Sequence, residues 1–265
     1  MSAPGIDTGT TDTDVTGPLD DDAVVQGLVN LLVVIGDNKY FLGRHLSKWS
    51  VGAPGLEAAV AVAAISQGHL GQARALFPFV DELAGEYTII GTPDTGRERR
   101  YNMACLDDEF ASWPRAVATL FLVDPALDII LRALNETQEE LARRIGRVLE
   151  ESRFHADFAR GRLAHLLATY PNARDEFLGD LRTVLVEVLA WFGPPGEAGV
   201  EAMKDAGVLA LDNDQMRTAW LDHVGPVLVE QGLADALGIG GGPGDWTHPE
   251  VPWDRFDALQ RRLET

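Results

Sequence analysis

The sequence has little cysteine and is short of basic residues. A single cysteine, Cys105, excludes an internal disulfide framework and leads us to expect a reducing, cytoplasmic compartment. There are 22 Lys and Arg residues against 41 Asp and Glu residues, which gives a formal net charge of −19. This charge argues against nucleic acid, which needs a basic surface, and against an anionic membrane. It is compatible with a halophilic surface or with one that is simply very soluble.

Long apolar runs and a basic leader are also lacking. The run Leu28–Ile35 is too short to cross a bilayer. Residues 1–22 contain no Lys or Arg, so we expect no signal peptide. Thr, Asp, Gly and Pro dominate residues 1–19, and we expect this stretch to be a disordered acidic tail.

From residue 20 onward, the apolar residues of the chain follow helical periodicity. The 265 residues are 46% hydrophobic, which suffices for a large core. Apolar spacing and Gly/Pro punctuation predict helices over 20–50, 55–87, 107–134, 136–169, 172–192, 196–209 and 213–237. The predicted fold is all-α, a ferritin-like four-helix bundle with additional C-terminal helices. We expect the helical domain to span 20–237, followed by a Gly/Pro loop and a C-terminal helical segment over 238–265.

Each of the first four predicted helices has an apolar stripe that is interrupted by polar residues near its middle. A buried polar group needs a partner, so such residues on four packed helices are expected to meet in one layer. Any one of them alone is more simply explained as a core residue satisfied locally, but the coincidence across four helices favours the layer. Its predicted members are Lys39, His69, Gln72, Asp124, Ser152 and His155.

This layer stands where helical bundles often hold two iron ions. Such sites use one Glu from each of two helices and a Glu-x-x-His pair from each of the other two. The equivalent positions here hold His69 and Gln72, Ser152 and His155, and singly Lys39 and Asp124. Only Asp124 is a carboxylate, and the ammonium of Lys39 cannot bind a metal. We therefore predict no metal and no catalytic residue. Lys39 and Asp124 could instead form an ion pair that fills the space of the irons, with His155, His69 and Gln72 as hydrogen-bond partners.

Two further groups of residues remain as alternatives. Glu151 and His155 have the i, i+4 spacing that can bind one metal on a helix face, so a single weak site is not excluded. Arg97, Arg99 and Arg100 lie within four residues of an acidic chain, and arginine binds phosphate through two parallel hydrogen bonds. These arginines fit a phosphate-bearing ligand and fit a solvated loop that balances nearby acids equally well.

Short motifs spread over residues 25–265 carry a family resemblance. They are Gly36-Asp37-Asn38, Leu42-Gly43-Arg44-His45-Leu46-Ser47-Lys48-Trp49, Ala53-Pro54-Gly55-Leu56-Glu57, Leu70-Gly71-Gln72-Ala73-Arg74, Glu98-Arg99-Arg100-Tyr101-Asn102, Glu151-Ser152-Arg153-Phe154-His155, Thr247-His248 and Leu259-Gln260-Arg261. Together they resemble the non-catalytic ferritin-like subunit of phenylacetyl-CoA epoxidase (the PaaC family).

The resemblance implies a role within a complex. A di-iron catalytic paralogue would epoxidise the ring of phenylacetyl-CoA with O2 in aerobic phenylacetate degradation, with further components that include a reductase. This chain would hold no cofactor and would support the catalytic subunit and acyl-CoA binding. The resemblance, with the arginine cluster, makes Glu57, Arg97, Arg99, Arg100, Tyr101 and Asn102 candidate acyl-CoA contacts. Three features depart from the family pattern. Gly68 stands where the family usually has an acid, Lys39 stands where the catalytic paralogue has a ligating Glu, and the tail 1–24 is additional. These departures leave open a diverged homologue that serves another acyl-CoA.

Two other functions remain as alternatives. One is a self-sufficient, metal-dependent oxygenase that uses Asp124, Glu151, His155 and His69. The other is a diverged helical-bundle scaffold that kept the fold and left the pathway.

Overall fold

The computed structural model describes residues 21–84, 101–135 and 139–264 of the chain. Within these ranges the structure is almost entirely helical, which confirms the predicted all-α class. The helices are α1 (Asp22–Gly52), α2 (Leu56–Ala84), α3 (Trp113–Asn135), α4 (Glu139–Thr169), α5 (Arg174–Trp191), α6 (Ala198–Asp205) and α7 (Asn213–Glu230).

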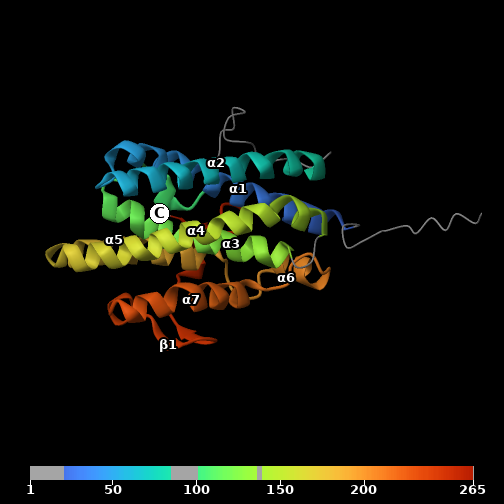
Figure 1. Cartoon of the computed structure of the whole chain (residues 1–265). Coiled ribbons are helices and arrows are strands. Elements are labelled where there is room, and N and C mark those ends of the chain that lie inside the picture. Colours follow the sequence, from blue (N-terminus) through green and yellow to red (C-terminus); the bar gives the residue numbers. More distant parts are fainter. Residues whose placement is uncertain (1–20, 85–100, 136–138, 265) are drawn as a thin grey trace, which may run out of the picture.

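The first four helices form the bundle. Helix α1 packs along α2 and α3 along α4, and contacts between α2 and α4 and between α1 and α3 close the ring (Figure 1). Helices α5 and α7 pack against the outside of α3, and α6 packs against α1. The core runs through all of these helices, so α3 is covered on both sides and its apolar residues are almost completely buried.

The helix starts follow from local chemistry. The side chain of Asp21 accepts from the backbone N–H of Ala23 and caps α1. Asp212 and Gln215 form a reciprocal capping box at the start of α7. These caps satisfy backbone N–H groups that have no partner inside the helix.

Helix α3 begins at Trp113, whereas periodicity predicted a start at residue 107. The chain before it is held against α1 by side chains: Asp37 accepts from the backbone N–H of Tyr101, and Asn38 accepts from that of Met103. The bonds and a 3-10 turn, η1 (Ala104–Leu106), hold the chain just before residue 107, and residues 107–112, the first turns of the predicted helix, are not helical. Sequence periodicity carries no information about such distant partners.

The segment after α7 corrects the prediction of a loop and a C-terminal helical segment. Strand β1 (Gly240–Gly242) pairs antiparallel with β2 (Asp245–Thr247), and β3 (Phe256–Asp257) pairs with β4 (Arg262–Leu263). The remaining helical pieces are single 3-10 turns: η2 (Pro171–Ala173), η3 (Asp235–Leu237) and η4 (Trp253–Arg255).

The first hairpin is fixed by contacts with α7. Asp222 accepts hydrogen bonds of 2.7 Å from the indole of Trp246 and from the backbone of Gly244. The indole packs so closely on Gly225 that a Cβ there would lie 2.7 Å from it. Tertiary contacts therefore determine this hairpin, because the short glycine-rich sequence of β1 does not by itself predict a strand.

Arg261 fastens the last residues to the end of α5. Its guanidinium donates to the carbonyls of Trp191 and Phe192 and forms an ion pair with Glu197 at 3.0 Å. Arg217 of α7 donates to the next carbonyl, that of Gly193. We call Arg217 and Arg261 the arginine clamp. The two cations satisfy carbonyls at the negative end of the α5 dipole.

Among the described helices, none combines the length and the apolar character that crossing a bilayer requires.

Candidate functional site

The six residues predicted to share a layer are all buried inside the four-helix bundle. Helix α1 contributes Lys39, α2 contributes His69 and Gln72, α3 contributes Asp124, and α4 contributes Ser152 and His155. The structure adds Asp128 of α3, which is also buried. We call these seven residues the polar layer.

Lys39 is the centre of the charges in the polar layer. Its Nζ lies 2.7 Å from Oδ1 of Asp124 and 3.0 Å from Oδ1 of Asp128. The predicted Lys39–Asp124 ion pair is therefore confirmed, but it is part of a triad. Asp128 was missed, although its i, i+4 spacing from Asp124 places both carboxylates on one face of α3 and was the available signal.

The two imidazoles lie side by side next to this triad, with ring centroids 4.6 Å apart. Nδ1 of His155 is 3.2 Å from Oδ2 of Asp124, within hydrogen-bonding distance. Nδ1 of His69 is 3.8 Å from Oδ1 of Asp124, beyond that distance. Neither ring nitrogen of His69 has a hydrogen-bond partner among the described residues.

Gln72 and Ser152 lie at the edge of the polar layer. Ser152 is placed to donate to Oδ1 of Asp128 at 3.0 Å and to the carbonyl of Val148 at 3.1 Å. Gln72 reaches only the Val148 carbonyl, at 3.5 Å, and its Oε1 has no partner among the described residues. In the structure, Gln72 therefore bonds to the backbone of α4 and not, as predicted, to the Lys39–Asp124 ion pair.

Gly68 matters because of its neighbour across the bundle. A Cβ at this position would lie 3.0 Å from Nε2 of His155. The absence of a side chain thus lets the imidazole approach α2 closely, with Nδ1 turned toward Asp124. The glycine that departs from the family pattern is a structural requirement for this position of His155.

Burial and mutual attraction set the charge states. Burial alone would lower the pKa of Lys39, but the carboxylates of Asp124 and Asp128 outweigh it and raise that pKa above its ordinary value. Burial alone would raise the pKa of Asp124, but Lys39 and the imidazoles hold it well below its usual range. Burial, reinforced by the charge of Asp124, raises the pKa of Asp128. Burial lowers the pKa of His69 well below its ordinary value, so this ring is neutral at pH 7.

A polar cavity of about 310 Å³ connects the polar layer with the surface. Asp124, Asp128 and Ser152 line its inner part, and the exposed residues Arg132, Arg153 and His223 line it as well. Small hydrophilic species therefore have a route to the two carboxylates.

The polar layer does not fit two iron ions. Such a pair needs about four carboxylates and their negative charge, and the layer offers two carboxylates and two imidazoles. Both carboxylates are already bound to the ammonium of Lys39, which cannot ligate a metal. The residues present are suited to an internal ion-pair network in place of a di-iron centre.

Of the six candidate acyl-CoA contacts, the structure describes Glu57, Tyr101 and Asn102. Tyr101 and Asn102 are buried, and the amide of Asn102 donates to Asp107 and to the carbonyl of Met103. Glu57 is exposed in the first turn of α2, where the helix dipole favours an acid. The cluster Arg97, Arg99 and Arg100 lies outside the described residues, so contact with an acyl-CoA stays a prediction for all six. Glu151, the other partner considered for His155, is exposed on α4.

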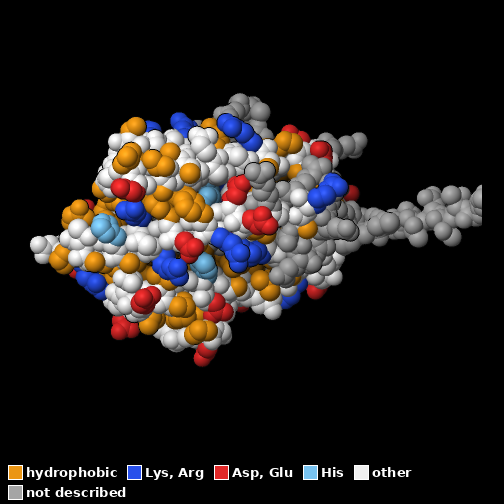
Figure 2. Space-filling model, in the orientation of Figure 1, with side chains coloured by type: hydrophobic (Ala, Val, Ile, Leu, Met, Phe, Trp, Pro, Cys, Tyr) orange, Lys and Arg blue, Asp and Glu red, His pale blue; other side chains and the backbone are white. Residues whose placement is uncertain are grey.

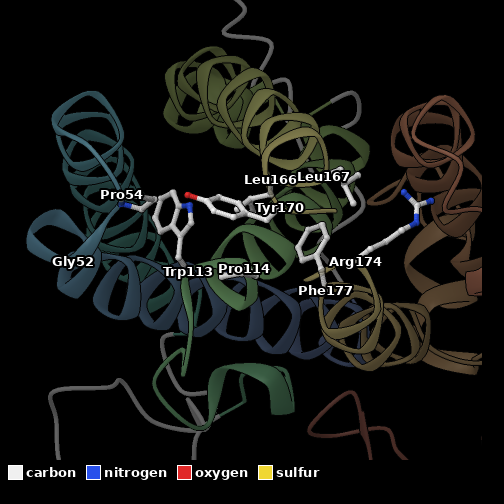
Figure 3. Close-up of a pocket in the computed structure, with 9 residues that line it drawn as sticks. All are labelled: Gly52, Pro54, Trp113, Pro114, Leu166, Leu167, Tyr170, Arg174 and Phe177. Carbon is white, nitrogen blue, oxygen red and sulfur yellow. The ribbon is translucent and has the colours of Figure 1, made fainter. Parts of the chain in front are cut away.

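A separate apolar pocket of about 360 Å³ lies where α1, α2, α3, α4 and α5 come together at one end of the bundle (Figure 3). The rings of Trp113, Tyr170 and Phe177 line it, and the guanidinium of Arg174 points away to the carbonyls of Gln231 and Gly232. The pocket can hold an apolar group, but the described residues that line it present no free charge.

Exposed apolar residues lie at the same end. Val51, Leu56 and Val60, around the α1–α2 connection, are exposed by 91%, 75% and 61%. Figure 2 shows hydrophobic side chains gathered over this part of the molecule. We call these three residues the apolar end.

Together, the bundle and its polar layer define a ferritin-like helical protein with a buried ion-pair network in its core. The family model described as phenylacetic acid catabolic protein (PaaA_PaaC) matches residues 19–264, and the chain belongs to this family. It is 30% identical over 134 residues to a subunit of the 1,2-phenylacetyl-CoA epoxidase of Escherichia coli (strain K12). That match covers 50% of this chain and 54% of the relative, so it spans about half the length of each.

Proposed function

We propose that this chain is a non-catalytic subunit of a multicomponent ring 1,2-epoxidase that acts on phenylacetyl-CoA in phenylacetate degradation. Membership of the phenylacetic acid catabolic family and the name of the Escherichia coli relative support the pathway and the complex. The observation that carries the non-catalytic role is the ammonium of Lys39, bound to both carboxylates of the polar layer. In this proposal the two irons reside in a paralogous catalytic partner, and a reductase is a further component.

The apolar end supports a role that depends on a partner. Exposed apolar patches on soluble proteins mark interaction sites, because burying them in a complex removes apolar surface from water. Val51, Leu56 and Val60 form such a patch beside an apolar pocket. We expect the paralogous catalytic subunit to cover it and acyl-CoA to bind within the assembled complex.

Co-expression with a di-iron paralogue tests the complex. We expect the two chains to co-purify, with about two irons in the partner and epoxidation of phenylacetyl-CoA only when both are present. Failure to recover any di-iron paralogue would favour the scaffold alternative. About two irons in this chain alone, with O2-dependent turnover, would contradict the non-catalytic role.

A pair of charge substitutions tests the surface. Leu56→Glu with Val60→Glu places two charges on the apolar end, and we expect the complex to dissociate in gel filtration while the isolated chain keeps its helical circular dichroism. Val229→Glu is the matched control, because Val229 is 54% exposed on α7, outside this patch. Equal loss of the complex in both variants would argue against the apolar end as the contact surface.

A further inference from the structure

We propose that His69, Asp124 and His155 bind a single divalent transition-metal ion of the zinc or ferrous class. This inference goes beyond the proposed function, which concerns the absence of a pair of irons, and it does not depend on it. It also departs from the leading sequence expectation of no metal, and it uses three of the four residues that the oxygenase alternative named, without Glu151.

The geometry of the three side chains comes first. One ligand atom from each residue can be chosen so that all three lie within 4.8 Å of one another. Metal–nitrogen and metal–oxygen bonds of about 2.0–2.2 Å put neighbouring ligand atoms of a tetrahedral site about 3.3 Å apart. Nδ1 of His155 and Oδ2 of Asp124 already lie 3.2 Å apart, so His69 is the residue that must move inward.

The unsatisfied imidazole of His69 is an independent observation. Its side chain is fully buried, yet neither ring nitrogen has a hydrogen-bond partner among the described residues. An unpartnered buried polar group costs about 1–3 kcal/mol, so natural cores rarely keep one without a use. A metal ion bound at Nδ1, which faces Asp124, would provide the missing partner for that nitrogen.

The charges of the polar layer also favour a cation. Lys39 is the one ammonium that contacts two buried carboxylates, so with both acids ionised the triad carries one net negative charge. Lys39 uses Oδ1 of Asp124, which leaves Oδ2 for a metal. The ion would then be balanced in part by the carboxylate charge that Lys39 does not neutralise.

The donor set and the cavity define which ion can bind and how it arrives. Two imidazole nitrogens and one carboxylate oxygen suit zinc or ferrous iron, whereas magnesium and calcium prefer oxygen alone. The polar cavity that reaches Asp124 from the surface supplies the entry path to this carboxylate.

The test uses tag-free full-length protein that has been stripped with a chelator and reloaded with zinc, and separately with cobalt as a spectroscopic probe. We expect one ion per chain to survive gel filtration, and zinc to raise the melting temperature by several degrees. Cobalt should show visible bands from a nitrogen and oxygen environment.

His69→Leu is the decisive variant because it removes a ligand without breaking a hydrogen bond. We expect zinc affinity to fall at least about 100-fold, since loss of a residue that merely supports a ligand already costs 10- to 100-fold. The metal-free melting temperature should stay the same or rise, because a buried unsatisfied group is removed. His155→Gln should lose the ion as well.

Two histidines outside the polar layer serve as controls. His45→Gln changes a buried imidazole that contacts the Leu106 carbonyl, and His165→Gln changes an exposed one. Both should retain one ion per chain. No retained ion in the wild type, or equal retention in His69→Leu, would overturn this inference and leave the proposed function intact. Two irons in this chain would overturn both.

Discussion

Two buried charged clusters in this protein are built in opposite ways. In the arginine clamp, every guanidinium nitrogen of Arg217 and Arg261 donates to a carbonyl or a carboxylate. In the polar layer, Lys39 is shared by two carboxylates and His69 has no hydrogen bond among the described residues. The clamp's neighbours Trp191 and Asn213 each keep one unpartnered atom, but its cations keep none.

The difference separates a structural cluster from one with binding capacity. A cluster whose donors are all used has nothing left to offer a ligand, and its value is the stability of the segments that it joins. A cluster with surplus negative charge and an unpartnered imidazole can still accept a cation. We therefore assign the arginine clamp to folding, whereas the polar layer keeps the capacity to bind that the proposed metal site would use.

The largest expected effect comes from Lys39→Met in metal-free protein. Removing the ammonium leaves Asp124 and Asp128 buried without a counter-charge, and we expect a loss of about 3–5 kcal/mol in the free energy of unfolding. Urea unfolding with a chelator present measures it. The triple variant that adds Asp124→Asn and Asp128→Asn should recover at least half of this loss, because no buried charge remains. A loss below about 1 kcal/mol for Lys39→Met would mean that Asp124 and Asp128 do not need the ammonium of Lys39 as a counter-charge.

Arg261→Met tests the clamp. It leaves Glu197 without its cation and the carbonyls of Trp191 and Phe192 without donors, and we expect a loss of about 2–4 kcal/mol. Arg261→Lys keeps the charge but not the planar fork, and it should lose a smaller amount. Metal content should be unchanged in both variants. A change in bound metal would break the distinction between the two clusters.

His45 is a buried imidazole outside both clusters, so it shows what burial alone does to the pH dependence of stability. Burial lowers the pKa of His45, even though its ring contacts the carbonyl of Leu106. The folded state keeps this ring neutral while the unfolded chain takes up a proton near pH 6.5, so the free energy of unfolding falls as pH drops below about 6.5. One such group contributes a slope of at most about 1.4 kcal/mol per pH unit.

Urea midpoints at pH 7.5 and 5.5 measure this slope. We expect His45→Gln to reduce it and His165→Gln, at an exposed site, to leave it unchanged. The slope that remains in His45→Gln is attributable to other buried imidazoles, which include His69. An unchanged slope in His45→Gln would mean that His45 takes up protons equally in the folded and unfolded states.

The smallest effect is expected for an exposed ion pair, which serves as a reference for the buried one. Lys48 and Glu109 form an ion pair in which the side chains are 52% and 62% exposed. Water and salt screen such a pair, so we expect Lys48→Met to leave the urea midpoint unchanged within error. A shift as large as that of Lys39→Met would show that exposure does not distinguish these two lysines.

Much of the bundle could be predicted because its physics is local. The stripe of α1 that contains Leu28, Leu32 and Leu42 is buried as its spacing indicates. The same period placed Lys39 and Asp124 on inward faces, and the cost of burying charge then required them to meet. Asp128 was missed because only one residue per turn was assigned to each stripe, although its spacing from Asp124 was readable.

The arginine clamp and the C-terminal hairpins were not predictable in this way. Arg261 lies 64 residues from Glu197, and no local pattern indicates that the two pair. The last segment resembled a helix in its apolar spacing, but Arg261 finds its partners at the end of α5 and the segment folds into the hairpin of β3 and β4. The start of α3 is also later than predicted: residues 107–112 are not helical, and Asp37 and Asn38 hold the chain just before them against α1.

The sequence by itself determined the all-α class, the four packed stripes and the polar residues near their middles, because periodicity and residue type are properties of each helix alone. Only the tertiary structure decided that Lys39 is shared by two acids, that His69 has no hydrogen-bond partner among the described residues and faces Asp124, and that a cavity connects the two acids with the surface. Distances between helices are set by how whole side chains pack, and this packing determines whether a layer of polar residues is a closed ion pair or a site with room for a metal.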